Sequence, residues 1–128
     1  MGSYRELRVW QHAVEMADML YTMTELWPKS ELYGMTNQAR RAAVSVAANI
    51  AEGKGRVADK PFRHHLLIAA GSLCEVETIV YLATKRSYCR AEDERLFLEK
   101  SGEVGRTLNG LIKSLDTKIA KVSHLWTE

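Results

Sequence analysis

Hydrophobic residues recur at intervals of three and four positions in four stretches of this chain, the spacing that places them on one face of a helix. No stretch shows the sustained apolar–polar alternation of a strand, and the two prolines fall where helices should begin or end. The stretches lie at about residues 9–26, 36–53, 60–86 and 91–122. Long helices joined by short connections pack antiparallel to their neighbours. The sequence therefore predicts an all-α protein, a single domain over residues 1–128 that forms an antiparallel up-down-up-down four-helix bundle.

The apolar face of each predicted helix identifies the residues expected in the core. In the first helix this face comprises Trp10, Ala13, Val14, Ala17, Leu20 and Tyr21. In the third it comprises Phe62, Leu66, Ala69, Leu73, Val76, Val80 and Ala83, and in the fourth Phe97, Val104, Leu108, Leu111, Leu115, Ile119 and Val122. The third helix has further apolar residues outside this face, namely Leu67, Ile68, Ala70, Ile79 and Leu82. We therefore expect this helix to be buried on more than one side.

Individual residues mark the expected helix ends and close helix contacts. Thr36 is expected to be the N-cap of the second helix, and Gly53 is expected to end it. Gly102, Gly105 and Gly110 lie within the fourth helix. Because glycine lowers helix stability by about 1 kcal/mol relative to alanine, these residues predict tight contacts of the fourth helix with its neighbours.

The composition is that of an ordinary globular domain. Of 128 residues, 46% are hydrophobic and 27% charged, and this length can bury a core without disulfides or metals. No apolar run approaches the roughly 20 residues that span a bilayer, and the first residues lack the apolar stretch of a secretory signal. These features indicate a cytoplasmic protein with no membrane partner. Cys74 is expected in the core and Cys89 in a loop.

Three segments, in this order, carry a family pattern: LRVWQ at residues 7–11, YGMTNQARRAAVS at 33–45 continuing through NIAEG at 49–53, and AAGSLCE at 69–75. The chain resembles, over roughly residues 4–122, the bacterial four helix bundle protein family, also called the ribosomal-RNA intervening-sequence protein family. The resemblance implies a four-helix bundle without enzymatic activity that assembles into a ring, often of five subunits. More distant relatives are accessory proteins of diversity-generating retroelements. The implied partners are other copies in a homopentamer, and RNA, DNA or a reverse-transcriptase-like protein.

A line of polar residues follows one face of the predicted second helix at steps of three and four. Its members are Gln38, Arg41, Ser45, Asn49 and Glu52. Alanine, valine and isoleucine flank this line, so its polar groups need partners, and Ser72 and Glu75 on the third helix are the natural ones. The pattern favours a hydrogen-bonded layer or a subunit interface, with an Arg41–Glu75 ion pair. A slot for a small molecule is the alternative.

Cationic residues from distant parts of the chain should meet at one end of the bundle. In an up-down-up-down bundle the turn at residues 53–58 lies at the same end as both chain termini. That end gathers Lys54, Arg56, Lys60, Arg63, Arg5, Arg8, Lys118 and Lys121. Nearby acidic residues are fewer, and a ring would repeat the cluster around its axis, which predicts a surface for RNA, DNA or an acidic protein. Exposed basic residues that serve only solubility are the alternative.

The sequence does not favour catalysis, a metal or a cofactor. A di-iron bundle would need Glu-x-x-His motifs, and none occurs here. His64 and His65 are adjacent and point about 100° apart on a helix, so they are poor joint ligands. Tyr88 and Trp126, near helix ends, are candidates for stacking on bases. The hypothesis is a non-catalytic, ring-forming adaptor; a protein scaffold without a nucleic-acid role and a small-molecule binder are the alternatives.

Overall fold

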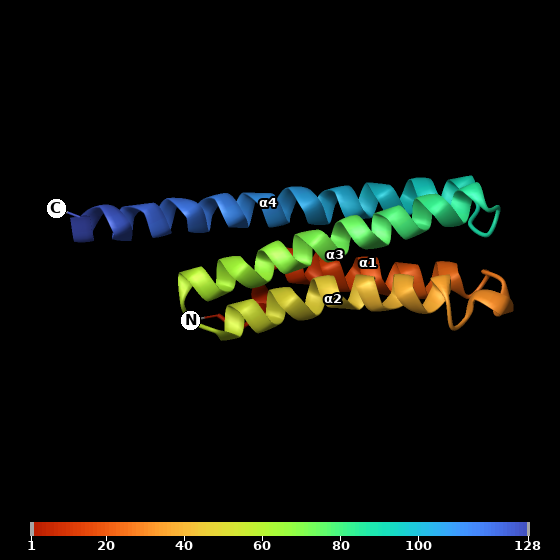
Figure 1. Cartoon of the computed structure of the whole chain (residues 1–128), viewed down its shortest axis with the longest axis horizontal. Helices are drawn as coiled ribbons and strands as arrows, with labels where there is room; N and C mark the ends of the chain where they lie inside the picture. The colour runs from red at the N-terminus through yellow and green to blue at the C-terminus, as the bar shows by residue number, and fades with distance from the viewer. Residues whose placement is uncertain (1, 128) are drawn as a thin grey trace.

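The chain folds into four long helices that run side by side (Figure 1). The structure is a computed structural model that describes residues 2–127, with side chains described as far as residue 123. The helices are η1 (Tyr4–Glu6), α1 (Arg8–Thr24), η2 (Lys29–Glu31), α2 (Met35–Gly55), α3 (Asp59–Lys85) and α4 (Ala91–Thr127). Consecutive α-helices run in opposite directions, so the predicted all-α, up-down-up-down bundle is confirmed.

Each α-helix packs against two others. The helices α1 and α3 both contact α2 and α4, and the contact between α2 and α3 is the most extensive. Within the described residues, the diagonal pairs α1–α3 and α2–α4 do not approach each other. Small side chains on α2 let its backbone come close to its neighbours; the buried alanines are Ala39, Ala42, Ala43 and Ala47.

The core of α3 agrees fully with its apolar periodicity, and that of α4 agrees in part. Every residue predicted for the α3 face is buried, as are Phe97, Val104, Leu108 and Leu115 of α4. Leu111 and Ile119 are half-buried, whereas Val122 is 51% exposed. The last turns of α4 run past the start of α3, which leaves them without a covering helix (Figure 1). The helix also continues beyond its predicted end at residue 122, to Thr127.

The predicted core face of α1 was partly wrong. Val14 and Tyr21 are 39% and 42% exposed, whereas Met16 and Met23 are buried. The helix lies against both α2 and α4, so its buried arc centres on Ala13, Met16 and Leu20, away from Val14 and Tyr21.

Both predicted ends of α2 require correction. Thr36 is not the N-cap: it is buried inside α2, and Gly34 occupies the N-cap position. Glu31 stabilises this end instead, because its carboxylate accepts a hydrogen bond from the Met35 N–H at 3.1 Å. At the other end α2 continues past Gly53 to Gly55, and Gly53 itself is buried against α3.

The glycines of α4 do not mark the tight contacts that we expected. A Cβ added at Gly110 would meet no atom within 4 Å, and one at Gly102 would meet only the mobile end of Arg106. At Gly105 it would make an ordinary contact of 3.4 Å with Leu73. The close approach lies elsewhere, at Gly53.

Cys89 lies in a loop as expected, whereas the expected core position of Cys74 was wrong. Cys74 is exposed on α3, and Cys89 is buried in the connection between α3 and α4. Burial raises the pKa of the Cys89 thiol, which makes it a weak nucleophile.

Candidate interaction surfaces

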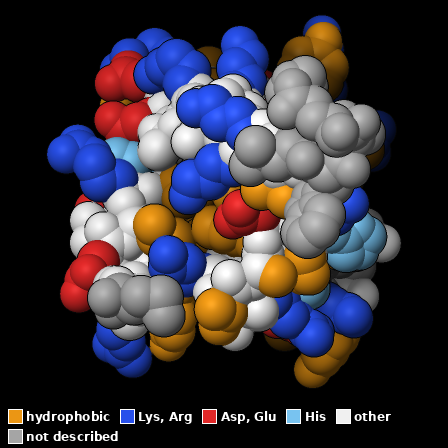
Figure 2. Space-filling model, turned by 90° about the vertical axis from the view of Figure 1, so that its left-hand side faces the viewer, with side chains coloured by type: hydrophobic (Ala, Val, Ile, Leu, Met, Phe, Trp, Pro, Cys, Tyr) orange, Lys and Arg blue, Asp and Glu red, His pale blue; other side chains and the backbone are white. Residues whose placement is uncertain are grey.

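The turn between α2 and α3 lies at the same end of the bundle as the N-terminus and the last turns of α4 (Figure 1). The turn is tight, and Val57 adopts a positive φ of 70°. Figure 2 looks onto this end, where Lys and Arg side chains are spread over the face with acidic groups between them. The topology therefore brings the predicted cationic residues to one end, which we call the basic end. Its members are Arg5, Arg8, Lys54, Arg56, Lys60, Arg63, Lys118 and Lys121.

Only part of the positive charge of the basic end is neutralised within the chain. Arg56 pairs with Glu52 at 3.3 Å, and Arg63 pairs with Asp116. Lys54 lies over the Phe62 ring, 5.9 Å from its centroid. Lys54 and the other five cations, six in all, make no ion pair with any carboxylate that the structure describes; the five are Arg5, Arg8, Lys60, Lys118 and Lys121.

A groove runs along the basic end between the first turns of α3 and the last turns of α4. It consists of two adjoining cavities of about 400 and 700 Å³, which share Lys60 and Ile119. The smaller cavity is also lined by Arg63, His64, Leu67 and Asp116, and the larger by Ala58, Asp59, Pro61, Val122 and Ser123. We call this the α3–α4 groove.

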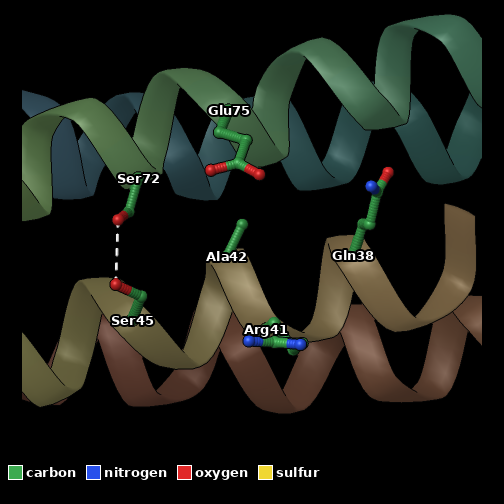
Figure 3. A pocket seen from close by; sticks show the side chains of 6 residues that line it. All are labelled: Gln38, Arg41, Ala42, Ser45, Ser72 and Glu75. Carbon is green, nitrogen blue, oxygen red and sulfur yellow. Dashed lines mark hydrogen bonds between the residues drawn. The ribbon is translucent and has the colours of Figure 1, made fainter.

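The polar line of α2 makes its strongest contacts with α3. The hydroxyls of Ser45 and Ser72 lie 2.9 Å apart (Figure 3). Asn49 donates through Nδ2 to the Ser45 carbonyl at 2.9 Å and to the Ser45 Oγ at 3.1 Å. Its Oδ1 lies 3.1 Å from Nδ1 of His65. The predicted hydrogen-bonded layer is therefore present in part: Ser45, Asn49 and Ser72 belong to it, and His65 is an additional member.

These contacts define the direction of the hydrogen bonds that Asn49 makes. Because Nδ2 of Asn49 donates to Ser45, Oδ1 must be the acceptor, and His65 donates to it through Nδ1–H. Ser45 Oγ accepts from Asn49, and because a hydroxyl has one proton and two lone pairs, either Ser45 or Ser72 can donate in the contact between them. The neutral His65 tautomer that fits this chain carries its hydrogen on Nδ1.

The expected Arg41–Glu75 ion pair does not form in the described part of the chain. Both side chains are exposed and line a cavity of about 360 Å³ with Gln38, Ala42, Ser45 and Ser72. In Figure 3 the Glu75 carboxylate points from α3 toward Ala42, and Arg41 lies along α2. Neither residue takes part in an ion pair with a described side chain. Glu52, the last member of the line, pairs with Arg56 of the basic end.

A charged cluster that the sequence pattern did not predict lies between α1 and α4. The Lys100 ammonium contacts Glu15, lies 2.9 Å from Glu103 and lies 3.2 Å from Nδ1 of His12. Hydrogen bonds from Lys100 lower the pKa of both carboxyls. Burial alone would lower the pKa of Lys100. The hydrogen bonds from Lys100 to Glu15 and Glu103 have the larger combined effect, so the pKa of Lys100 is raised. Residue spacings of three on each helix hinted at this cluster, but only the packing of α1 on α4 joins the two halves.

The outer face of α3, which no other helix covers, is apolar. Leu67, Ile68 and Leu82 are 44%, 40% and 47% exposed, so the predicted burial on more than one side is not achieved within one chain. An 18-residue window of α3 has a mean hydropathy of 1.7, which by length and composition would allow a membrane span; a third of this window is buried. The expectation that no stretch is this apolar therefore needs correction. Core helices of bundles share this composition, so hydropathy alone does not identify a membrane segment.

Of the two predicted stacking residues, Tyr88 does not belong to the basic end. Tyr88 lies in the connection between α3 and α4, at the opposite end of the bundle, where its hydroxyl contacts Glu31 at 3.4 Å. The Trp126 side chain lies outside the described residues. Among the side chains that the structure describes, no three His, Cys, Asp or Glu residues come together as possible metal ligands.

The fold and its surfaces define a small antiparallel four-helix-bundle protein with a basic end, a polar cavity between α2 and α3, and exposed apolar residues on the outer face of α3. Residues 5–110 match the 23S rRNA-intervening sequence protein family, and the chain belongs to this family. This confirms the family resemblance seen in the sequence motifs.

A solved structure supports the fold independently. It is a protein with unknown function from the S23 ribosomal protein family of Bacteroides thetaiotaomicron, with a TM-score of 0.74 and 24% sequence identity to this chain. The match covers 82% of this chain and 95% of that chain. At this identity the likeness shows the fold alone. No curated protein matches the chain significantly.

Proposed function

We propose that this protein is a non-catalytic, self-assembling adaptor whose basic end holds nucleic acid or a nucleic-acid-associated protein. The observation that carries the proposal is the set of six cations at this end, Lys54 among them, without a carboxylate partner in the described chain. Unpaired surface cations attract phosphates and release their counterions, and this supplies most of the affinity of nonspecific nucleic-acid binding. No base-reading motif is present, so we expect little sequence preference.

Self-assembly is supported by the outer face of α3. A soluble monomer would leave Leu67, Ile68 and Leu82 in water, although Leu82 lies about 21 Å along α3 from Ile68. Burial of these large apolar side chains against another molecule would be favourable. A second copy of the chain is the partner that we propose for Ile68 and Leu82, in keeping with the ring that the family resemblance implies. Such a ring would place several basic ends close together and raise the affinity for a polyanion through multivalency.

The test is the salt dependence of binding to mixed RNA and DNA. The variant Lys54→Glu, Arg56→Glu, Lys60→Glu should bind more weakly than the parent. Its plot of log affinity against log salt should be shallower by about 0.7–0.9 for each phosphate contact that is lost. Equal affinity of parent and variant would show that the basic end is not the site.

A matched control changes the same amount of charge at the opposite end of the bundle. Lys29, Lys85 and Arg86 are exposed there, and the variant Lys29→Glu, Lys85→Glu, Arg86→Glu has the same net charge as the basic-end variant. If both variants lose affinity equally, the effect reflects net charge and not a site. A client protein that stays bound in high salt would instead favour a scaffold held by apolar contacts.

A further inference from the structure

The α3–α4 groove has a mixed chemistry that distinguishes it from the rest of the basic end. Its floor is apolar, formed chiefly by Pro61, Leu67, Ile119 and Val122, and Val122 is 51% exposed. The exposed His64 ring stands at the smaller cavity, in edge contact with the ring of the next histidine. A surface that only attracted phosphates would need neither an apolar floor nor an aromatic ring.

Cations border this floor. Lys60 lines both cavities, and Lys118 and Lys121 each precede a floor residue on α4. The acidic Asp116 is bonded to Arg63, which leaves Asp59 as the remaining lining carboxylate. From Asp59 to Leu67 the groove extends about 12 Å along α3, at a rise of 1.5 Å per residue. Its cavities fall within the roughly 300–1,000 Å³ of typical small-ligand sites.

A ligand that satisfies both features carries phosphates beside unpaired, flat and largely apolar rings. Single-stranded nucleic acid has this chemistry, because its bases can leave the stack and pack against aromatic or apolar side chains. A duplex keeps its bases paired inside and offers only its backbone to such a groove. An acidic peptide could pair with the cations, but an aromatic ring is not part of its repeating unit, whereas every nucleotide carries a flat base beside its phosphate.

We infer that the nucleic acid held at the basic end is single-stranded, with a base inserted in the α3–α4 groove against His64 and Val122. This inference rests on the proposed function and specifies its ligand class. The phosphates on either side of the inserted base contact Lys60 and the lysines of α4.

Four probes separate this inference from simple charge attraction. They are a short single-stranded RNA of mixed sequence, the same RNA annealed to its complement, inorganic polyphosphate and polyglutamate. Charge attraction alone favours the duplex over the single strand, because the duplex has the higher charge density. Base insertion reverses this order. We therefore expect the single strand to bind about tenfold more tightly than the duplex, the usual magnitude of one base–aromatic stack.

Two substitutions remove the groove chemistry without changing charged residues of the basic end. His64→Ala and Val122→Thr alter exposed side chains, so both variants should fold; Tyr33→Ala, at a residue 91% exposed near the opposite end, is the matched control. We expect each groove variant to weaken single-strand binding several-fold, up to about tenfold for His64→Ala, and to leave duplex and polyphosphate binding unchanged.

The outcomes are distinguishable. Duplex binding as tight as single-strand binding, or equal losses for polyphosphate and RNA in the groove variants, would overturn the inference and leave the proposed function standing. Polyglutamate binding that exceeds RNA binding would identify an acidic protein as the occupant and overturn the inference. Binding of none of the four probes would overturn both proposals.

Discussion

Gly53 marks the closest approach of α2 and α3, and Gly53→Ala should destabilise the bundle. A Cβ at this position would lie 2.7 Å from the His65 Cβ, 3.0 Å from Cδ1 of Phe62 and 3.2 Å from the Phe62 carbonyl oxygen. Two of these atoms are a Cβ and a backbone oxygen, so no side-chain rotation relieves the clash, and the helices must move apart. Because α2 and α3 share the most extensive contact of the bundle, such a movement disturbs many neighbours.

The size of the effect follows from two opposing contributions. Overpacking a well-filled core destabilises by typically 1–3 kcal/mol, whereas replacing glycine by alanine within a helix stabilises by about 1 kcal/mol. We expect a net loss of about 1–2 kcal/mol in the free energy of unfolding. Urea denaturation at fixed protein concentration, followed by circular dichroism, measures this loss as a lower midpoint at an unchanged slope.

Gly110→Ala is the matched control. Gly110 also lies within a helix, but it is exposed, and an added Cβ would meet no atom within 4 Å. Only the higher helix propensity of alanine remains, so the free energy of unfolding of this variant should rise by up to about 1 kcal/mol. If Gly53→Ala were stabilised as much as Gly110→Ala, the close approach of α2 and α3 at residue 53 would be refuted.

The remaining predictions concern the charged cluster, the outer face of α3 and the polar layer. Lys100→Met should lower the free energy of unfolding at pH 7, because Glu15 and Glu103 lose the ammonium that lowers their pKa values. The extra stability of the parent is complete above the ordinary carboxyl pKa of 4.5 and is lost as the pH falls through the lowered pKa values. The urea midpoints of parent and variant should therefore converge in acid. Equal midpoints at pH 7 would contradict this. Ile68→Glu with Leu82→Glu should reduce the mass seen by light scattering while the helix content stays constant; an unchanged mass would exclude this face from assembly. Ser45→Ala should lower the free energy of unfolding by about 0.5–1.5 kcal/mol, because the half-buried Ser72 hydroxyl loses its partner while Asn49 keeps the Ser45 carbonyl as an acceptor. A denaturation midpoint equal to the parent's would refute a stabilising contribution of this hydrogen bond.

Periodicity predicted the fold well where a helix has one sharply defined apolar face. The core face of α3 was predicted completely, because its members follow an unbroken alternation of steps of four and three. The further apolar residues Leu67, Ile68 and Leu82 lie outside this repeat and are exposed. On α1 the methionines widened the apolar surface to more than half the helix, and the sequence could not show which part faces the core. The packing of α1 between α2 and α4 resolved this in favour of Met16 and Met23.

Local signals were less reliable than periodicity at the helix ends. Thr36 is a residue type that is favoured as an N-cap, but here the free N–H of Met35 donates its hydrogen bond to the Glu31 carboxylate of the preceding 3-10 helix. Gly53 has the chemistry of a helix end, yet its function here is to admit the neighbouring helix. In both positions a tertiary contact overrides a preference that is local to the sequence.

The candidate surfaces were predictable to the extent that topology alone determines them. The basic end needs only the alternation of helix directions, so cations separated by more than a hundred residues along the chain could be assigned to one end before any side chain was placed. Which of these cations are neutralised depends on how far their side chains reach, and the Arg63–Asp116 pair joins two helices in a way that residue spacing cannot reveal.

The α3–α4 groove was harder to predict from the sequence than the basic end. It exists because α4 runs past the start of α3, and this overhang exposes Val122 beside Pro61 where the periodicity had predicted a core contact. The wrong prediction for Val122 therefore identifies the groove. An apolar helix face that continues beyond its partner helix can contact another molecule, and here cations without carboxylate partners lie beside it.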